Sequence, residues 1–163
     1  MKIKLEDVRL SYPSLFKKAK FNGEDTKYEA TFVLPKDRPE YEVMKAEIDR
    51  LLKEAKIKVS ADKICLKDGD ETESPVYKNA WTIKAANSMR PTVINRDKSP
   101  LTEEDQVVYA GCYVNAIIEF WVQNNAYGKR VNANLHGVQF FKDGEPLSAG
   151  SVADPDEFDD VDI

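Results

Sequence analysis

The sequence has few of the residues from which catalytic and metal sites are built. It contains one histidine, His136, and two cysteines, Cys65 and Cys112, which lie far apart in apolar segments. A structural zinc ion usually needs four Cys or His ligands at short spacings, so we expect neither a metal site nor a cofactor. Isolated cysteines of this kind indicate reduced, partly buried thiols in a cytosolic protein.

Sequence motifs of common enzymes are also missing. The chain has no G-x-x-x-x-G-K-[ST] loop, no G-x-G-x-x-G and no G-x-S-x-G elbow. No serine or cysteine lies near His136 in the sequence. Glu29 and Glu119 are solitary acids on expected strands, whereas a two-metal nuclease needs clustered carboxylates. We predict that the protein is not an enzyme, and keep a small nuclease or resolvase as an alternative.

Long apolar stretches are absent as well. No run of about 18 apolar residues is present that could span a membrane, and the opening MKIKLEDVRL lacks the apolar core of a secretion signal. With 163 residues and a hydrophobic fraction of 42%, the chain fits one domain with a core of ordinary size. We therefore expect a cytoplasmic protein without a membrane partner.

Negative charge is concentrated at one end of the chain. The formal net charge is −5, but residues 154–163, DPDEFDDVDI, hold six acidic residues and no basic ones. The rest of the chain has 23 acidic and 24 basic residues, and such a body can hold a basic groove because binding depends on the local field. Charge separation of this kind is typical of an interaction tail. We predict a folded domain over residues 1–149 and a flexible acidic tail over residues 150–163.

Two long strands are predicted between Tyr109 and Phe141. Apolar side chains recur at every second position on both sides of a short polar connection, Gln123 to Lys129, so one face of both strands packs into a core. The apolar positions change phase near Gly137. The predicted core face comprises Val114, Ala116, Ile118, Phe120, Val122, Val131, Ala133 and Leu135.

The rest of the chain predicts shorter strands and one helix. A change of apolar phase at Glu6–Asp7 indicates a bulge or bend in the first strand. Asp37 is placed to cap an amphipathic helix that has Pro39 in its first turn. The order of elements indicates an α+β, mainly β fold, in which an antiparallel barrel carries one amphipathic helix. The further strands are expected over residues 2–12, 26–34, 81–87 and 90–96.

The second face of the two long strands is unusual for a solvated surface. It carries aromatic rings, cations and amides where Lys, Glu and Thr would be common. Rings that stack on bases and cations that follow phosphates are what binding of an unpaired nucleic-acid strand requires. We predict a nucleic-acid site formed by Tyr113, Trp121, Arg130, Asn132, Asn134 and His136, and extended by Trp81, Lys84, Arg90, Arg96, Tyr127 and Lys129.

Several of these side chains also fit a simpler explanation. Trp81 next to Ile83 is typical of a core residue, Trp121 could pack in a second layer, and Arg96 could face solvent in a loop. A barrel that binds a partner protein and no nucleic acid is therefore a further alternative. Failure to bind any oligonucleotide would favour it.

Several segments carry a family resemblance. Tyr109-Ala-Gly-Cys-Tyr-Val-Asn-Ala and the later HGVQFFKDGEPLSAG, residues 136–150, resemble a phage family of single-stranded DNA-binding proteins that was long filed as a domain of unknown function. KLEDVRLSYPSLF and YEATFVLPKD resemble the first two strands of that family. The resemblance implies an OB-fold barrel that coats single-stranded DNA during replication or recombination, in the cytoplasm of an infected bacterium. RNA remains a possible ligand, because stacking on rings does not reject a 2′-hydroxyl.

The acidic tail is similar to the C-termini of bacterial and phage single-strand-binding proteins. This similarity implies that the tail recruits replication or recombination proteins and competes with DNA for the groove. The common pattern ends in an aromatic residue, whereas this chain ends in Ile163, and a tail that only keeps the protein soluble is the alternative. The oligomeric state is left open, with a homo-oligomer among the possibilities. The expected partner-binding residues are Asp156, Glu157, Phe158, Asp159, Asp160, Asp162 and Ile163.

Overall fold

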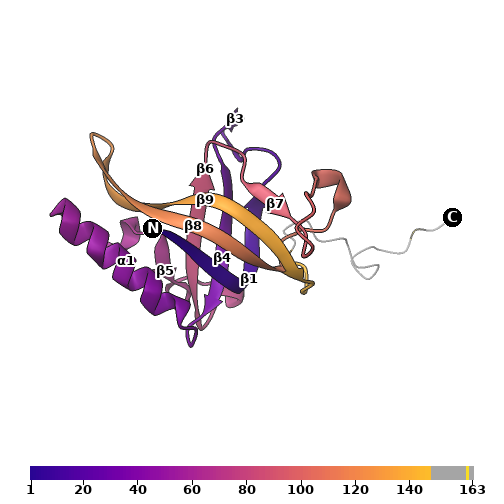
Figure 1. Ribbon diagram of the computed structural model, residues 1–163, viewed down its shortest axis with the longest axis horizontal. Coiled ribbons are helices and arrows are strands. Elements are labelled where there is room, and N and C mark those ends of the chain that lie inside the picture. The colour runs from indigo at the N-terminus through magenta and orange to yellow at the C-terminus, as the bar shows by residue number, and fades with distance from the viewer. Residues whose placement is uncertain (148–160, 162–163) are drawn as a thin grey trace.

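The computed structural model describes residues 1–147 and Val161, and shows a β-barrel with one helix across its end (Figure 1). Its helical elements are α1 (Glu40–Ala55) and four 3-10 turns, η1 (Ala61–Lys63), η2 (Gly69–Glu71), η3 (Pro75–Tyr77) and η4 (Glu103–Asp105). Its strands are β1 (Lys2–Ser14), β2 (Lys20–Phe21), β3 (Glu24–Asp25), β4 (Tyr28–Pro35), β5 (Leu66–Asp68), β6 (Ala80–Asn87), β7 (Thr92–Ile94), β8 (Tyr113–Asn125) and β9 (Gly128–Lys142). The predicted tail, 150–163, lies outside the described residues except for Val161.

Closure of the barrel depends on a contact between strands that are far apart in sequence. The main sheet has the order β5-β6-β4-β1-β8-β9-β7, and an additional parallel pairing of β6 with β9 at Ala86 and Asn134 joins its two sides. The closed part therefore contains the five strands β6, β4, β1, β8 and β9, and the short strands β5 and β7 lie at its margins. The predicted fold class, a mainly antiparallel barrel with a single amphipathic helix, is confirmed.

The β8–β9 hairpin is longer than the sequence suggests. Its pairing continues to Asn125 and Gly128, so the turn consists of Ala126 and Tyr127 alone. The prediction of a polar connection from Gln123 to Lys129 is wrong, because polar side chains there pair across the strands. The side-chain amide of Asn132, for example, donates to Oε1 of Gln123 at 2.9 Å.

Two bulges bend the barrel where the apolar pattern changes phase. In β1 the pairing with β8 shifts between Leu5 and Val8, and Asp7 adopts a φ of 51°. The extra residue keeps Leu5 and Val8 both buried, as the sequence indicated. The second shift lies in β9 near Gly137, because Ile117 pairs with Gly137 while Ile118 pairs with Leu135.

Helix α1 covers one end of the barrel and packs against β8. It begins after Pro39, which occupies the N-cap position without a side-chain cap, so the prediction that Asp37 caps the helix is wrong. The helix buries Met44 and Ile48 as the apolar stripe predicted, together with Glu47. The Glu47 carboxylate bonds to Arg50 at 2.7 Å, and this bond is the main reason that its pKa lies below the ordinary value.

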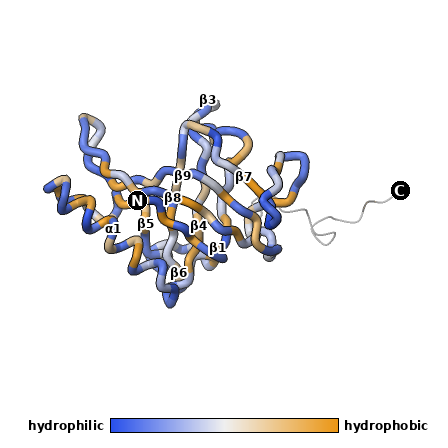
Figure 2. The backbone as a smooth tube through the Cα atoms, viewed as in Figure 1, coloured by the Kyte–Doolittle hydropathy of each residue, from blue (hydrophilic) through white to orange (hydrophobic). Residues whose placement is uncertain are grey.

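The distribution of hydrophobic residues along the strands agrees with a closed barrel. Hydrophobic and hydrophilic residues alternate along the barrel strands, and hydrophilic residues predominate at the end of the β8–β9 hairpin (Figure 2). The core contains the alternate residues of all five barrel strands, and its largest fully buried side chains include Phe32, Leu5, Leu10 and Leu34. No helix in the described part of the chain is long and apolar enough to cross a bilayer.

Gly111 provides a test of how tightly the chain packs beside the barrel. Its φ is +109°, and an added Cβ would lie 2.1 Å from the carbonyl oxygen of Glu145. Gly23 also has a positive φ, +82°, but an added Cβ there would meet nothing within 4 Å. We expect Gly23→Ala to lower the free energy of unfolding by about 1–2 kcal/mol, and Gly111→Ala by about 1–3 kcal/mol more. Urea unfolding measures both values, and equal losses would contradict this account.

Candidate nucleic-acid interface

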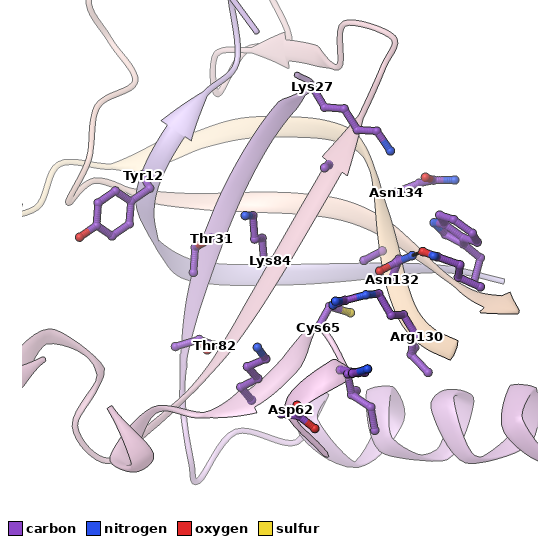
Figure 3. A pocket seen from close by; sticks show the side chains of 18 of the residues that line it. Tyr12, Lys27, Thr31, Asp62, Cys65, Thr82, Lys84, Arg130, Asn132 and Asn134 are labelled. Carbon is purple, nitrogen blue, oxygen red and sulfur yellow. Dashed lines mark hydrogen bonds between the residues drawn. The ribbon is translucent and has the colours of Figure 1, made fainter. Parts of the chain in front are cut away.

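A groove with a volume of about 630 Å³ runs over the outer face of β4, β6 and β9 (Figure 3). Its lining includes Thr31 of β4, Thr82 and Lys84 of β6, and Asn132 and Asn134 of β9. Thr31, Lys84, Asn132 and Asn134 each lie between two buried residues, so the period of two that fills the core also turns these side chains into the groove. The closing contact between β6 and β9 brings the two sets together.

The loop before β5 completes the floor of the groove. The backbone amide of Cys65 donates to the carbonyl of Val131 in β9 at 3.0 Å, and the carbonyl of Cys65 accepts from the amide of Lys84 in β6 at 3.2 Å. Cys65 thus links β6 and β9 where these strands do not pair directly. Ile64 forms a parallel bridge with Val131 on the same side.

Positive charge predominates in the lining of the groove. Asp62 is the acidic side chain among the lining residues, and its pKa is lowered by a hydrogen bond with Ser60 and, less strongly, by neighbouring lysines. Lys84 lies 3.2 Å from Glu29, whereas the other four cations make no ion pair within residues 1–147. Unpaired cations on a concave surface attract phosphates. The five cations are Lys27, Lys63, Lys67, Lys84 and Arg130.

One tryptophan and three amides supply contacts for bases. Trp121 lies opposite Asn132 in the β8–β9 ladder, and its side chain is 36% exposed at the rim of the groove. Asn132, Asn134 and Gln123 line the adjoining wall. An amide group both donates and accepts hydrogen bonds, so it can meet the edge of any base. The arrangement provides both stacking and hydrogen bonding for bases.

The groove includes five of the side chains predicted from the sequence, namely Lys84, Trp121, Arg130, Asn132 and Asn134. Tyr113 is not among them. It lies eight positions before Trp121 on β8, which corresponds to roughly 26 Å along a strand. Its ring lies under Nζ of Lys142 at 4.8 Å and 5.9 Å from the guanidinium of Arg9. The prediction that Tyr113 and Trp121 share one surface is corrected, because β8 is long and coils around the barrel.

His136 lies on a different surface as well. Beyond Asn134, strand β9 leaves β6 and pairs with β7, so its outward side chains face away from the groove. Nε2 of His136 lies 3.0 Å from Oε1 of Glu119, and this bond lowers the pKa of the Glu119 carboxyl. His136 lines a smaller cavity of about 350 Å³ with Lys2 and Ile117.

Trp81 belongs to the packing between β6 and α1. Its ring stacks on Tyr41 of the helix, with the centroids 4.1 Å apart and the planes at 4°. Lys36 lies over the same ring at 4.9 Å. The position of Trp81 therefore supports a role in packing, which was the simpler of the two explanations.

The remaining predicted residues lie outside the groove. Arg90 covers the ring of Phe16 at 5.5 Å, and Arg96 covers the ring of Phe141 at 5.9 Å. Tyr127, in the turn of the β8–β9 hairpin, is 88% exposed, and Lys129 beside it is also exposed.

Other residues that line the groove were not predicted from the sequence, among them Tyr12, Lys27, Lys63, Lys67 and Gln123. Lys63 and Lys67 lie in a segment that shows no apolar period, so the sequence offered no face to which they could be assigned. Tyr12 lies at a register shift of β1, adopts a φ of 47° and is 71% exposed. In the sequence, a tyrosine directly before Pro13 was the only signal for Tyr12.

The described residues contain no cluster of three or more His, Cys, Asp or Glu side chains that could hold a metal ion. Cys65 and Cys112 are free thiols. Within this part of the chain, the fold gathers cations, amides and aromatic rings on one face, which is the groove.

The five barrel strands follow in the order β1, β4, β6, β8 and β9 along the chain, and the barrel closes between the third, β6, and the fifth, β9. This topology defines an OB-fold protein. The groove across its strands has the cations, ring and amides of a single-strand-binding surface. The chain belongs to the family described as "Enterobacter phage Enc34, ssDNA-binding protein", whose profile matches residues 1–163.

Known relatives agree with this assignment. The putative protein p50 of Acyrthosiphon pisum secondary endosymbiont phage 1 is 42% identical over 174 residues, which cover 99% of this chain and 94% of the relative. The structure of the single-stranded DNA-binding protein of bacteriophage Enc34 in complex with ssDNA superposes with a TM-score of 0.83 and 35% identity, over 90% of this chain and 89% of that one. The single-stranded DNA-binding protein gp2.5 of bacteriophage T7 shares the fold, with a TM-score of 0.59 and 11% identity over 94% of this chain and 98% of its own.

The thiol of Cys65 offers a probe of the groove floor. Burial raises its pKa from an ordinary 9.0 to about 12, so at pH 8 the thiolate fraction in the folded protein is roughly a thousandth of the unfolded value. In a Cys112→Ala variant, we expect alkylation of Cys65 to be at least about 100-fold slower in the native protein than in urea. Mass spectrometry measures both rates. Equal rates would show that the thiol is not held in the floor of the groove.

Proposed function

We propose that the protein binds single-stranded DNA in the groove across β4, β6 and β9 and catalyses no reaction. The observation that carries the proposal is the combination of five cations, an exposed tryptophan and three amides on one concave face of an OB-fold barrel. Membership of a family named for ssDNA binding, and a similar structure in complex with ssDNA, support the same conclusion.

Each group in the groove has a simple physical task. Lys27, Lys63, Lys67, Lys84 and Arg130 neutralise phosphates and release counterions, so affinity falls as salt rises. The ring of Trp121 stacks on a base of any identity, since every base has a π-face. The amides complete hydrogen bonds to whichever base edge faces them. The site therefore binds with little sequence preference.

A non-catalytic role follows from the same chemistry. Bound strands are covered and protected, and the described residues contain no cluster that could hold a metal ion beside them. The thiol of Cys65 in the groove floor stays protonated, because burial raises its pKa to about 12. We place this activity in phage replication or recombination in the cytoplasm of an infected bacterium. Single-stranded RNA is a further expected ligand, because these contacts are not specific to a sugar. A duplex is expected to bind more weakly, because its paired bases are not free to stack on Trp121.

Trp121 is the residue whose removal tests the groove directly. Trp121→Ala removes one stacking contact worth about 1–3 kcal/mol, so we expect affinity for labelled oligo(dT) to fall about 5- to 150-fold while the fold is retained. Fluorescence anisotropy at low and moderate salt measures the affinity, and a matched duplex measures the preference for single strands. A separate sample with magnesium tests for cleavage of the DNA.

Tyr113→Ala is the matched control, since it deletes an aromatic ring on the same strand but outside the groove. Its affinity should stay within about twofold of the wild type. If Tyr113→Ala weakened binding and Trp121→Ala did not, the site would lie at the other end of β8. Magnesium-dependent cleavage would favour the nuclease alternative.

The acidic tail is proposed to compete with DNA for the groove and to bind replication or recombination proteins. The argument rests on charge, because residues 154–163 contain six acids and the groove is lined by five cations. The residues concerned are Asp156, Glu157, Phe158, Asp159, Asp160, Asp162 and Ile163.

Truncation after Gly150 tests the competition. Removal of the acids frees the cations, so oligo(dT) should bind several-fold more tightly at low salt, and the gain should shrink as salt screens the charges. Titration of truncated and full-length protein with the same oligomer measures the difference. Unchanged or weaker binding of the truncated protein would refute the competition.

A further inference from the structure

A second group of basic side chains lies between the end of α1 and the groove. Residues 53–67 contain five lysines and two carboxylates. Lys63 and Lys67 already line the groove. The other three, Lys53, Lys56 and Lys58, form what we call the basic strip, and all three are exposed.

The fold holds the basic strip outward. Lys56 ends the helix in a left-handed conformation with a φ of 57°, and the amide of Ile57 donates to the carbonyl of Leu52 at 3.3 Å. Ile57 and Val59 are half-buried, and Val59 packs against the core. Because neighbouring side chains of an extended segment point to opposite sides, Lys58 faces solvent.

Neighbouring acids do not neutralise the strip. Lys53, Lys56 and Lys58 make no ion pair within residues 1–147, and the nearby Glu54 bonds to Arg50 at 2.9 Å. Favourable interaction with the helix dipole accounts for Lys53 in the last turn and Lys56 at the C-cap. It does not account for Lys58, which lies beyond the helix.

The strip lies close to the groove along the chain. Lys58 lies five residues before Lys63, which corresponds to at most about 18 Å of chain. Turn η1, which joins them, contacts β9, and α1 packs against β8. In Figure 3, Asp62 of η1 lies at the end of the groove next to the helix.

We propose that single-stranded DNA leaving the groove past Lys63 continues over the basic strip, so that the complete binding site is longer than the groove. The inference rests on the proposed function. Residues 53–63 contain no aromatic side chain, so this extension contacts phosphates and adds no stacking. It increases affinity for long strands regardless of sequence.

The size of the effect follows from counterion release. For single strands, each phosphate contact contributes about −0.7 to the slope of log K against log salt, so three lysines contribute about −2. Between about 50 and 200 mM salt, the wild type should therefore lose roughly 15- to 20-fold more affinity for a long strand than a protein without the strip.

The test combines one triple variant with two lengths of DNA. Lys53→Gln, Lys56→Gln and Lys58→Gln are introduced together, and anisotropy is measured with oligo(dT) of about 6 and about 20 nucleotides, which bracket most known site sizes. We expect the short oligomer to bind the variant as it binds the wild type. The long oligomer should bind the variant more weakly and with the shallower salt slope.

A matched control removes the same charge elsewhere. Lys2→Gln, Lys4→Gln and Lys98→Gln change three exposed lysines that do not line the groove, and should leave both slopes as in the wild type. Thermal melting confirms that both variants fold.

Each outcome separates the two claims. If the wild type binds neither oligomer, the proposed function fails. If the short oligomer binds but the strip variant keeps the wild-type slope with the long one, the extension fails and the groove stands. Equal losses in strip and control variants would show that the overall charge acts, and would also overturn the extension.

Discussion

The groove depends on the backbone of one residue. Cys65 donates to β9 through its amide and accepts from β6 through its carbonyl, at 3.0 and 3.2 Å. These bonds continue a closure that β6 and β9 make directly at Ala86 and Asn134, where the side-chain amide of Asn87 also reaches the carbonyl of Leu135 at 3.1 Å. Without these contacts between β6 and β9 the sheet would remain open, and the side chains of the two strands would not face a common groove. The binding surface is thus a product of barrel closure.

Much of the fold could be predicted because its information is local. Alternation along β8 and β9 identified the core face, and a change of apolar phase predicted the bulge at Asp7. The change of phase near Gly137 coincides with a second register shift. The capping residue of α1 could not be predicted, since Asp37 and Pro39 both fit a helix start and only the backbone decides between them. The length of the hairpin also escaped, because amides that look like a loop pair across its strands.

The candidate site was predictable only where the residues share a short stretch of strand. Trp121, Asn132 and Asn134 are neighbours in one ladder, so the period of two that grouped them in the sequence also places all three on the groove. Tyr113 and His136 have the same phase but lie further along strands that coil, and phase alone carries no information about rotation around a barrel. Lys63 and Lys67 reach the groove through an irregular segment, whose position is fixed by contacts with β6 and β9 that no local pattern encodes.

The two tryptophans of the chain occupy opposite situations. Trp81 stacks on Tyr41 under the ammonium of Lys36, within the contact between the barrel and its helix. Trp121 stands partly exposed at the rim of the groove. The intrinsic fluorescence of tryptophan therefore combines emission from a ring packed inside the fold, which is sensitive to unfolding, with emission from a ring at the groove, which is sensitive to a ligand stacked on it. Unfolding and ligand binding can therefore both be followed by tryptophan fluorescence, without an added label.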